Sequence, residues 1–175
     1  MKKKTKQVTD FLAGLHSAIT SSPLLRKNTV GDKTEQQMQT EIRPIIIRYL
    51  ENHFKNAGFK DAEAKAHESF YWEGQEGKYG RKRNLTFAAR NYPDFIITKP
   101  YLLAIEYKKS DNGSLIKQGI GQSIMHTLSD DFDYVFYLFH DQCKEKCIAK
   151  SAQGAKESGI IDMLWQQFNV FVRVI

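Results

Sequence analysis

The stretch YPDFIITKPYLLAIEYK, residues 92–108, contains two apolar runs separated by a lysine and a proline. Runs of β-branched and aromatic residues between turn residues are typical of strands, so the stretch predicts an antiparallel strand pair. If residues 99–101 form a three-residue loop, residue 96 pairs with residue 104 and Asp94 faces Glu106. A loop with an even number of residues would place the two carboxylates on opposite faces of the sheet.

Side-chain direction alternates along the second strand, so Glu106 and Lys108 lie on the same face, next to the small Ala104. Opposed residues of an antiparallel pair have Cβ atoms roughly 4.5–5.5 Å apart. Asp94 and Glu106 would therefore repel each other unless a cation lies between them. The pattern predicts a cation site with a lysine beside it. The alternative is a solvent-facing edge on which Glu and Lys simply alternate.

Apolar residues recur at helical spacing before this stretch. The spacing predicts a helix over about residues 6–20. A longer helix is predicted to begin at the capping-box pattern Thr34-Glu35-Gln36-Gln37 and to end at Ala57-Gly58. Pro44 lies inside this second helix, which therefore either kinks or restarts there.

The rest of the chain predicts an α/β fold. Aromatic and β-branched runs at 70–72 and 85–87 indicate two more strands that precede the pair described above. An amphipathic helix is expected over about 114–128, and the apolar run 134–139 is typical of a strand covered on both faces. A last helix-to-strand pass is expected at the C-terminus. Because the sequence contains no internal repeat or linker, we expect one domain over residues 1–175.

Composition limits the class of protein. Of the 175 residues 41% are hydrophobic, which is enough for a domain with its own core. Two cysteines are too few for a disulfide framework, so free thiols and a reducing compartment are expected. The basic start, Met1 to Lys6, lacks a following apolar run, which argues against a signal peptide and a membrane span. We therefore expect a cytoplasmic protein without membrane contact.

The charge balance favours a polyanionic partner. The chain has 26 basic and 20 acidic residues, giving a net charge of +6, and the sequence pI is about 9.2. Such an excess is typical of proteins that bind nucleic acid. The sequence contains no GxSxG, GK[ST] or HExxH pattern, which argues against serine hydrolases, nucleotide hydrolases and zinc proteases.

Pro93-Asp94, followed after eleven residues by Glu106-Tyr107-Lys108, resembles the motif of the PD-(D/E)XK nuclease superfamily. The order of a helix, three strands, a helix and a strand over about residues 35–140 is similar to the common core of that superfamily. The resemblance implies a restriction-endonuclease-like core. This is a central mixed β-sheet flanked by helices in αβββαβ order, here with an extra N-terminal helix and a C-terminal strand.

The resemblance also implies roles for single residues. Asp94 and Glu106 would bind Mg²⁺ together with the backbone carbonyl of Tyr107, and Mn²⁺ could substitute. Lys108 would orient or deprotonate the attacking water. Hard oxygen ligands suit Mg²⁺, which stabilises charge on the scissile phosphate and lowers the pKa of bound water. Family members often add a glutamate from the first core helix, here Glu41 or else Glu35.

Basic and amide side chains near this motif are expected to contact nucleic acid. They lie in the glycine-rich loop 73–84, before the Pro-Asp pair, directly after the motif and on the following helix. The residues are Lys78, Arg81, Lys82, Arg83, Arg90, Lys109, Lys117, Gln118 and Gln122. The tyrosine that exonuclease-type members carry four residues after a glutamine is missing, because Gln122 and His126 occupy those positions.

Together these features predict a Mg²⁺-dependent endonuclease of the restriction type, acting on double-stranded DNA as a homodimer. One alternative is a structure-selective nuclease for Holliday junctions or repair. Another is a basic nucleic-acid-binding module without catalysis. His140, Asp141, Cys143 and Cys147 are of metal-ligating types, but a single cysteine pair does not complete a tetrahedral zinc site, so free thiols are expected.

Overall fold

The computed structural model describes residues 5–26, 33–73, 75, 85–86, 89–90, 92–129 and 131–175. The helices are α1 (Lys6–Thr20), α2 (Pro23–Arg26), α3 (Glu35–Asn56), α4 (Ala62–Glu68), α6 (Gly113–Leu128), α7 (Cys147–Ala152) and α8 (Ala155–Phe168). The strands are β1 (Phe70–Trp72), β2 (Leu85–Thr86), β3 (Ala89–Arg90), β4 (Phe95–Ile97), β5 (Leu103–Ser110), β6 (Tyr134–Asp141) and β7 (Val170–Val174).

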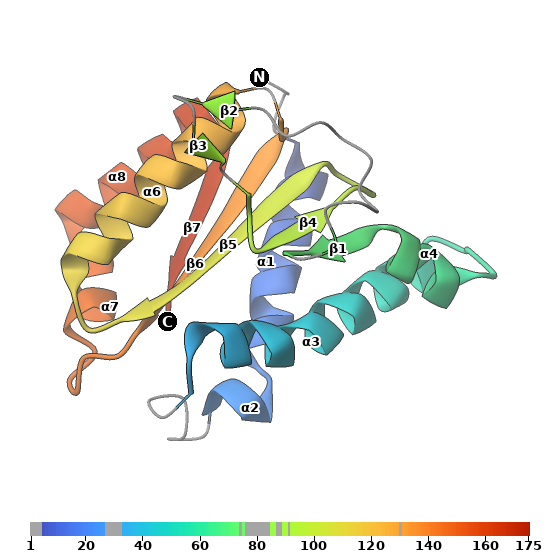
Figure 1. Cartoon of the computed structure of the whole chain (residues 1–175), viewed down its shortest axis with the longest axis horizontal. Helices are drawn as coiled ribbons and strands as arrows, with labels where there is room; N and C mark the ends of the chain where they lie inside the picture. Colours follow the sequence, from blue (N-terminus) through green and yellow to red (C-terminus); the bar gives the residue numbers. More distant parts are fainter. Residues whose placement is uncertain are drawn as a thin grey trace.

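Five of these strands form one mixed sheet in the order β1-β4-β5-β6-β7 (Figure 1). The pairs β1–β4 and β4–β5 are antiparallel, whereas β5–β6 and β6–β7 are parallel. Helices flank this sheet, so the predicted α/β class with a central mixed sheet is confirmed. Among the described residues, the short strands β2 and β3 pair with each other and not with this sheet. The run 85–87, indicated as a strand by the sequence, is thus a strand over Leu85–Thr86 that belongs to a separate two-stranded sheet.

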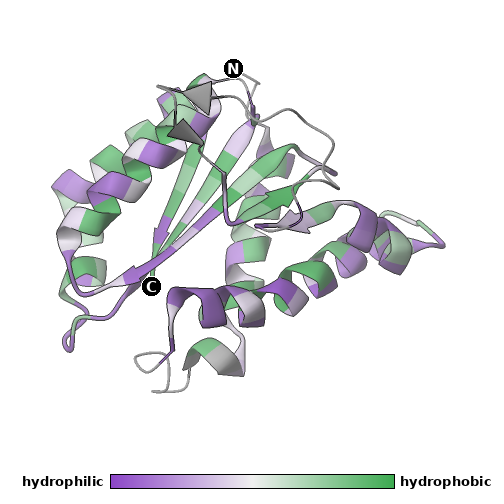
Figure 2. Ribbon diagram, in the orientation of Figure 1, coloured by the Kyte–Doolittle hydropathy of each residue, from purple (hydrophilic) through white to green (hydrophobic). Residues whose placement is uncertain are grey.

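Side chains of alternate strand residues fill two separate cores, one on each face of the sheet. On one face, Ile97 and Ile105 pack with the apolar stripes of α1 and α3. On the other face, Ile96 and Ala104 pack with residues of α6 and α8. Figure 2 shows that β5 is apolar along its first half and hydrophilic toward its end. The charged residues of β5 therefore lie in its second half, although Tyr107 between Glu106 and Lys108 still packs in the core.

The predicted register of the β4–β5 pair is confirmed. Ile96 pairs with Ala104, and Phe95 pairs with Ile105. The three residues 99–101 of the turn include a cis peptide bond between Lys99 and Pro100. One further step of this register places residue 94 opposite residue 106.

Helices α1 and α3 match the ranges predicted from the sequence. The capping box of α3 is present, because the Thr34 hydroxyl accepts from the backbone N–H of Gln37 and the Gln37 side chain accepts from the backbone of Thr34. These contacts satisfy donors that the first helical turn leaves free. The helix runs without interruption through Pro44, so the restart considered from the sequence does not occur.

Two features differ from the sequence-based expectations. Strand β5 continues past Lys108, where the stretch considered from the sequence ends, to Ser110, because β6 pairs with it along its full length despite the charged residues. Cys143 and Cys147 form a disulfide, so the expectation of free thiols is wrong. Lys146 has a left-handed backbone (φ 53°) within the loop that joins the two cysteines.

Among the described helices, none is both long and apolar enough to cross a membrane.

Candidate metal and phosphodiester site

Asp94 lies directly before β4, and its carboxylate is held at both oxygens. Its side chain is buried, with 7% of the residue exposed. Oδ1 accepts a hydrogen bond from Nε2 of Gln39 on α3 at 2.7 Å. Oδ2 accepts from the backbone N–H of Tyr107 on β5, also at 2.7 Å. The carboxylate is thus fixed between the first core helix and the second strand of the pair.

Glu106 is the second buried carboxylate, with 4% of the residue exposed. Its Oε1 lies 2.8 Å from Nε2 of His126 on α6. With its hydrogen at Nε2, the imidazole donates to this carboxylate, which in its ionised form only accepts hydrogen bonds. Four elements, α3, β4, β5 and α6, therefore determine where the two carboxylates lie.

Lys108 completes the constellation from the end of β5. Its ammonium nitrogen lies 2.8 Å from Oε1 of Glu35, in the first turn of α3. Both side chains are about one-third exposed, at 29% and 34%. The pair therefore stands at the border between the buried carboxylates and solvent.

The structure brings Glu35 rather than Glu41 to this site. Glu41 pairs with Lys33, with 2.6 Å between Oε1 and Nζ. Glu35 and Gln39 are four residues apart, so they share one face of α3, whereas Glu41 lies six residues after Glu35 and points away from that face. The preference for Glu41 drawn from the sequence is corrected accordingly. The sequence left the choice open because the phase of the helix relative to the sheet was unknown.

These side chains line one polar cavity of about 330 Å³. Its walls come from α3, the segment after β1, the β4–β5 pair and α6. The lining residues are Glu35, Gln36, Gln39, Glu73, Tyr92, Asp94, Glu106, Lys108 and Gln122. Four carboxyl groups thus face one ammonium group, so the cavity attracts cations.

Burial and the charges around the cavity shift the pKa values of Asp94 and Lys108. Burial, reinforced by the charge of Glu106, raises the pKa of Asp94 from 3.8 to about 7, against the opposing effects of the Tyr107 N–H and Lys108. Burial alone would lower the pKa of Lys108, but its hydrogen bond to Glu35 and the charges of the neighbouring carboxylates raise it above its ordinary value. Lys108 is therefore a charged donor, which suits the orientation of water better than its deprotonation.

The expected nucleic-acid contacts are only partly near the cavity. Gln122 lines it. Lys109 donates from its ammonium group to the backbone carbonyl of Lys33. Gln118 is exposed on α6. Arg90 ends β3, and nothing is described of its side chain. The remaining loop residues lie outside the described part of the chain: Lys78, Arg81, Lys82 and Arg83.

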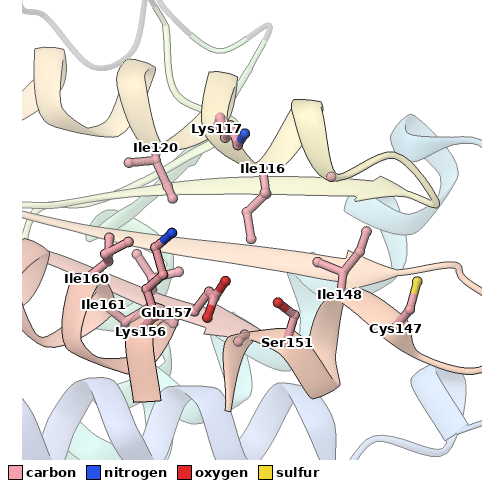
Figure 3. A pocket seen from close by; sticks show the side chains of 13 residues that line it. Ile116, Lys117, Ile120, Cys147, Ile148, Ser151, Lys156, Glu157, Ile160 and Ile161 are labelled. Carbon is pink, nitrogen blue, oxygen red and sulfur yellow. The ribbon is translucent and has the colours of Figure 1, made fainter. Parts of the chain in front are cut away.

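Lys117 lies at a different, largely apolar cavity of about 500 Å³. Figure 3 shows Ile116 and Ile120 of α6 pointing toward Ile148 of α7 and Ile160 of α8. This cavity is formed by helices α6, α7 and α8 and does not include the acidic residues described above. The prediction of a nucleic-acid contact at Lys117 is therefore not linked to the acidic cavity.

A second group of possible metal ligands begins at the last residue of β6, Asp141. Ligand atoms of Asp141, Cys143 and Cys147 lie within 4.8 Å of one another. The two sulfurs are bonded to each other, and the Asp141 oxygens accept from the backbone N–H groups of Cys143 and Ala149. His140 is not part of this group, because its Nδ1 faces the Tyr107 hydroxyl at 3.4 Å. These contacts therefore stabilise the turn between β6 and α7.

Sequence reasoning missed four polar residues that line the cavity, Gln36, Gln39, Glu73 and Tyr92, and also His126, which contacts Glu106. The spacing of four between Glu35 and Gln39 was a usable signal for Gln39. His126 lies on the buried face of α6 together with Gly119. This stripe of small and polar residues indicated a close helix-to-sheet contact, but not which strand residue His126 would reach.

Comparison of the chain with protein-family models, with curated proteins and with solved structures finds no match.

Proposed function

We propose that the chain is a Mg²⁺-dependent DNA endonuclease that hydrolyses phosphodiester bonds, as the resemblance to the PD-(D/E)XK superfamily implies. The observation that carries the proposal is the convergence of two buried carboxylates, Asp94 and Glu106, with the ammonium group of Lys108 in one polar cavity. Two buried like charges are costly unless they bind a cation. This cost favours a functional role over an ordinary solvent-facing edge.

The donor set fits a hard divalent cation. The candidate ligands are carboxylate oxygens and the backbone carbonyl of Tyr107, and oxygen ligands suit Mg²⁺ and Mn²⁺. A strand residue directs its N–H and C=O to the same neighbour, so the Tyr107 carbonyl lies on the side of Asp94, to which its N–H donates. Burial and, after it, the charge of Glu106 raise the pKa of Asp94 by more than the Tyr107 N–H and Lys108 lower it. When bound, the cation would polarise the scissile phosphate and lower the pKa of a water ligand.

The residues of the chain then divide the remaining work. Gln39 and the Tyr107 N–H hold the Asp94 carboxylate in one orientation. Glu35 holds the ammonium group of Lys108 at the open side of the cavity, where it can donate to the attacking water and to a phosphate oxygen. Such preorganised donors lower the barrier because they need no rearrangement when charge develops.

Two finer points belong to the same proposal. Cleavage of both strands by a chain with one site favours a homodimer on double-stranded DNA. Specificity of the restriction type would come from loops that contact the DNA. Discrete fragments from linear plasmid DNA support this type, whereas preferential cleavage of four-way junctions supports the structure-selective alternative.

The test is cleavage of plasmid and junction DNA with Mg²⁺ or Mn²⁺ by the wild type, Lys108→Ala and Asp94→Asn. Lys150→Ala, at an exposed lysine on α7, is the matched control. We expect metal-dependent cleavage by the wild type and the control and its loss in the two site variants. Binding of DNA without cleavage of any substrate would overturn the proposal in favour of a non-catalytic binding module. Equal cleavage by all four proteins would locate the activity elsewhere.

A further inference from the structure

Glu106 depends on a contact from a helix that lies outside the strand pair. Its Oε1 lies 2.8 Å from Nε2 of His126, and the two side chains are only 5% and 2% exposed. The Phe132 ring meets the imidazole edge-on, with 5.7 Å between the ring centroids and an interplanar angle of 88°. Protein groups therefore fix both the position and the plane of the imidazole.

Close packing of α6 on the sheet brings His126 within reach. A Cβ atom on Gly119, seven residues earlier and on the same buried face, would lie only 2.3 Å from the hydroxyl oxygen of Tyr137 on β6. Only glycine allows the helix to approach the strand this closely. The Ser123 hydroxyl, between Gly119 and His126 on the same face, bonds back to the Gly119 carbonyl and so requires no partner from the sheet.

We propose that His126 is a positioning residue for the metal site, an inference that rests on the proposed function. The hydrogen bond from His126 holds Glu106 by Oε1, which leaves Oε2 for a cation shared with Asp94. Asp94 has equivalent support from Gln39 and the Tyr107 N–H. Groups that hydrogen-bond to metal-ligating carboxylates orient them, and their loss typically weakens metal binding 10- to 100-fold.

The test is the dissociation constant of Mn²⁺, measured by calorimetry on the full chain. His126→Leu removes the donor, and we expect its Mn²⁺ affinity to fall roughly 10- to 100-fold. The amide nitrogen of a glutamine occupies nearly the place of the histidine Nε2, so His126→Gln is expected to restore most of the affinity. The amide nitrogen of an asparagine corresponds to Nδ1 instead, so His126→Asn is expected to bind Mn²⁺ as weakly as the leucine variant.

The controls separate this inference from the proposed function. His67→Leu, at an exposed histidine on α4, is expected to bind Mn²⁺ like the wild type. Glu106→Gln is expected to abolish binding. If the wild type binds Mn²⁺, Glu106→Gln does not, and His126→Leu binds like the wild type, the inference fails while the proposed function stands. If the wild type binds no Mn²⁺, both fail.

The pair of amide variants keeps the test decisive if His126→Leu does not fold. Glutamine and asparagine are both polar, and unfolding by urea checks that the two variants are folded. A difference in Mn²⁺ affinity between them supports positioning through Nε2. Equal affinities in two folded variants would overturn it.

Discussion

The substitution Asp94→Asn should remove a pH dependence of stability that the cavity imposes on the metal-free protein. The folded carboxyl group keeps its proton up to about pH 7, because burial and Glu106 raise its pKa from 3.8 to about 7. The unfolded group loses its proton near pH 4. Between these values the folded state binds more protons than the unfolded state, so the free energy of unfolding falls as the pH rises.

The size of the effect follows from the two pKa values. Each pH unit in that window changes the free energy of unfolding by about 1.4 kcal/mol. Ionised Asp94 therefore costs the folded, metal-free protein up to about 4 kcal/mol, of which about 3 kcal/mol develops between pH 5 and pH 8. An asparagine does not ionise, but its amide has a single acceptor oxygen and keeps only one of the two hydrogen bonds that the carboxylate accepts, which costs about 1–3 kcal/mol at every pH.

Urea unfolding followed by tryptophan fluorescence in EDTA, at pH 5 and pH 8, measures this difference. The stability of the wild type relative to Asp94→Asn should fall by about 3 kcal/mol from pH 5 to pH 8. Mg²⁺ added at pH 8 should stabilise the wild type more than the variant. Asp10→Asn, at an exposed carboxylate paired with Lys6, should follow the wild type. If the free energies of unfolding of the wild type and Asp94→Asn change equally between pH 5 and pH 8, the assignment of this pH dependence to the Asp94 carboxyl group is refuted.

Two further predictions concern α6 and α3. Gly119→Ala should destabilise the protein by about 1–3 kcal/mol in thermal or urea unfolding, because its Cβ would overlap the ring of Tyr137. On the same helix a Cβ on Gly121 meets no described atom within 4 Å, so Gly121→Ala should stabilise the protein by up to about 1 kcal/mol. A Gly119→Ala variant that is more stable than Gly121→Ala would contradict the close packing of Gly119 on Tyr137. Glu35→Gln should slow DNA cleavage by up to about 100-fold because Lys108 loses its anchor, whereas Glu41→Gln should cleave within a few-fold of the wild type. Equal losses in these two glutamine variants would contradict the placement of Glu35 at the cavity.

Much of the strand pair was predictable from the sequence because its determinants are local. The three-residue turn and the period-two alternation together fix which residues oppose each other, and the register at Ile96 and Ala104 confirms this. The first helix was predictable for the same reason, since Val8, Leu12 and Leu15 form one buried stripe.

The remaining parts of the site depend on how distant elements pack. The choice between Glu35 and Glu41 requires the rotation of α3 relative to β5, which no local pattern encodes. The contact between His126 and Glu106 requires the distance between α6 and the sheet, which Gly119 sets. The cysteine pair was misjudged because its four-residue spacing is also compatible with separate thiols, whereas the left-handed residue within the loop is a property of the folded chain.

The most direct test of the central claim is to locate Mn²⁺ by anomalous X-ray scattering in crystals of the protein grown or soaked with this ion. A peak is expected between the carboxylates of Asp94 and Glu106, within about 2–2.5 Å of at least one oxygen from each. A well-diffracting crystal that binds Mn²⁺ only elsewhere, with both carboxylates free of it, would contradict the proposed metal site and the nuclease chemistry built on it.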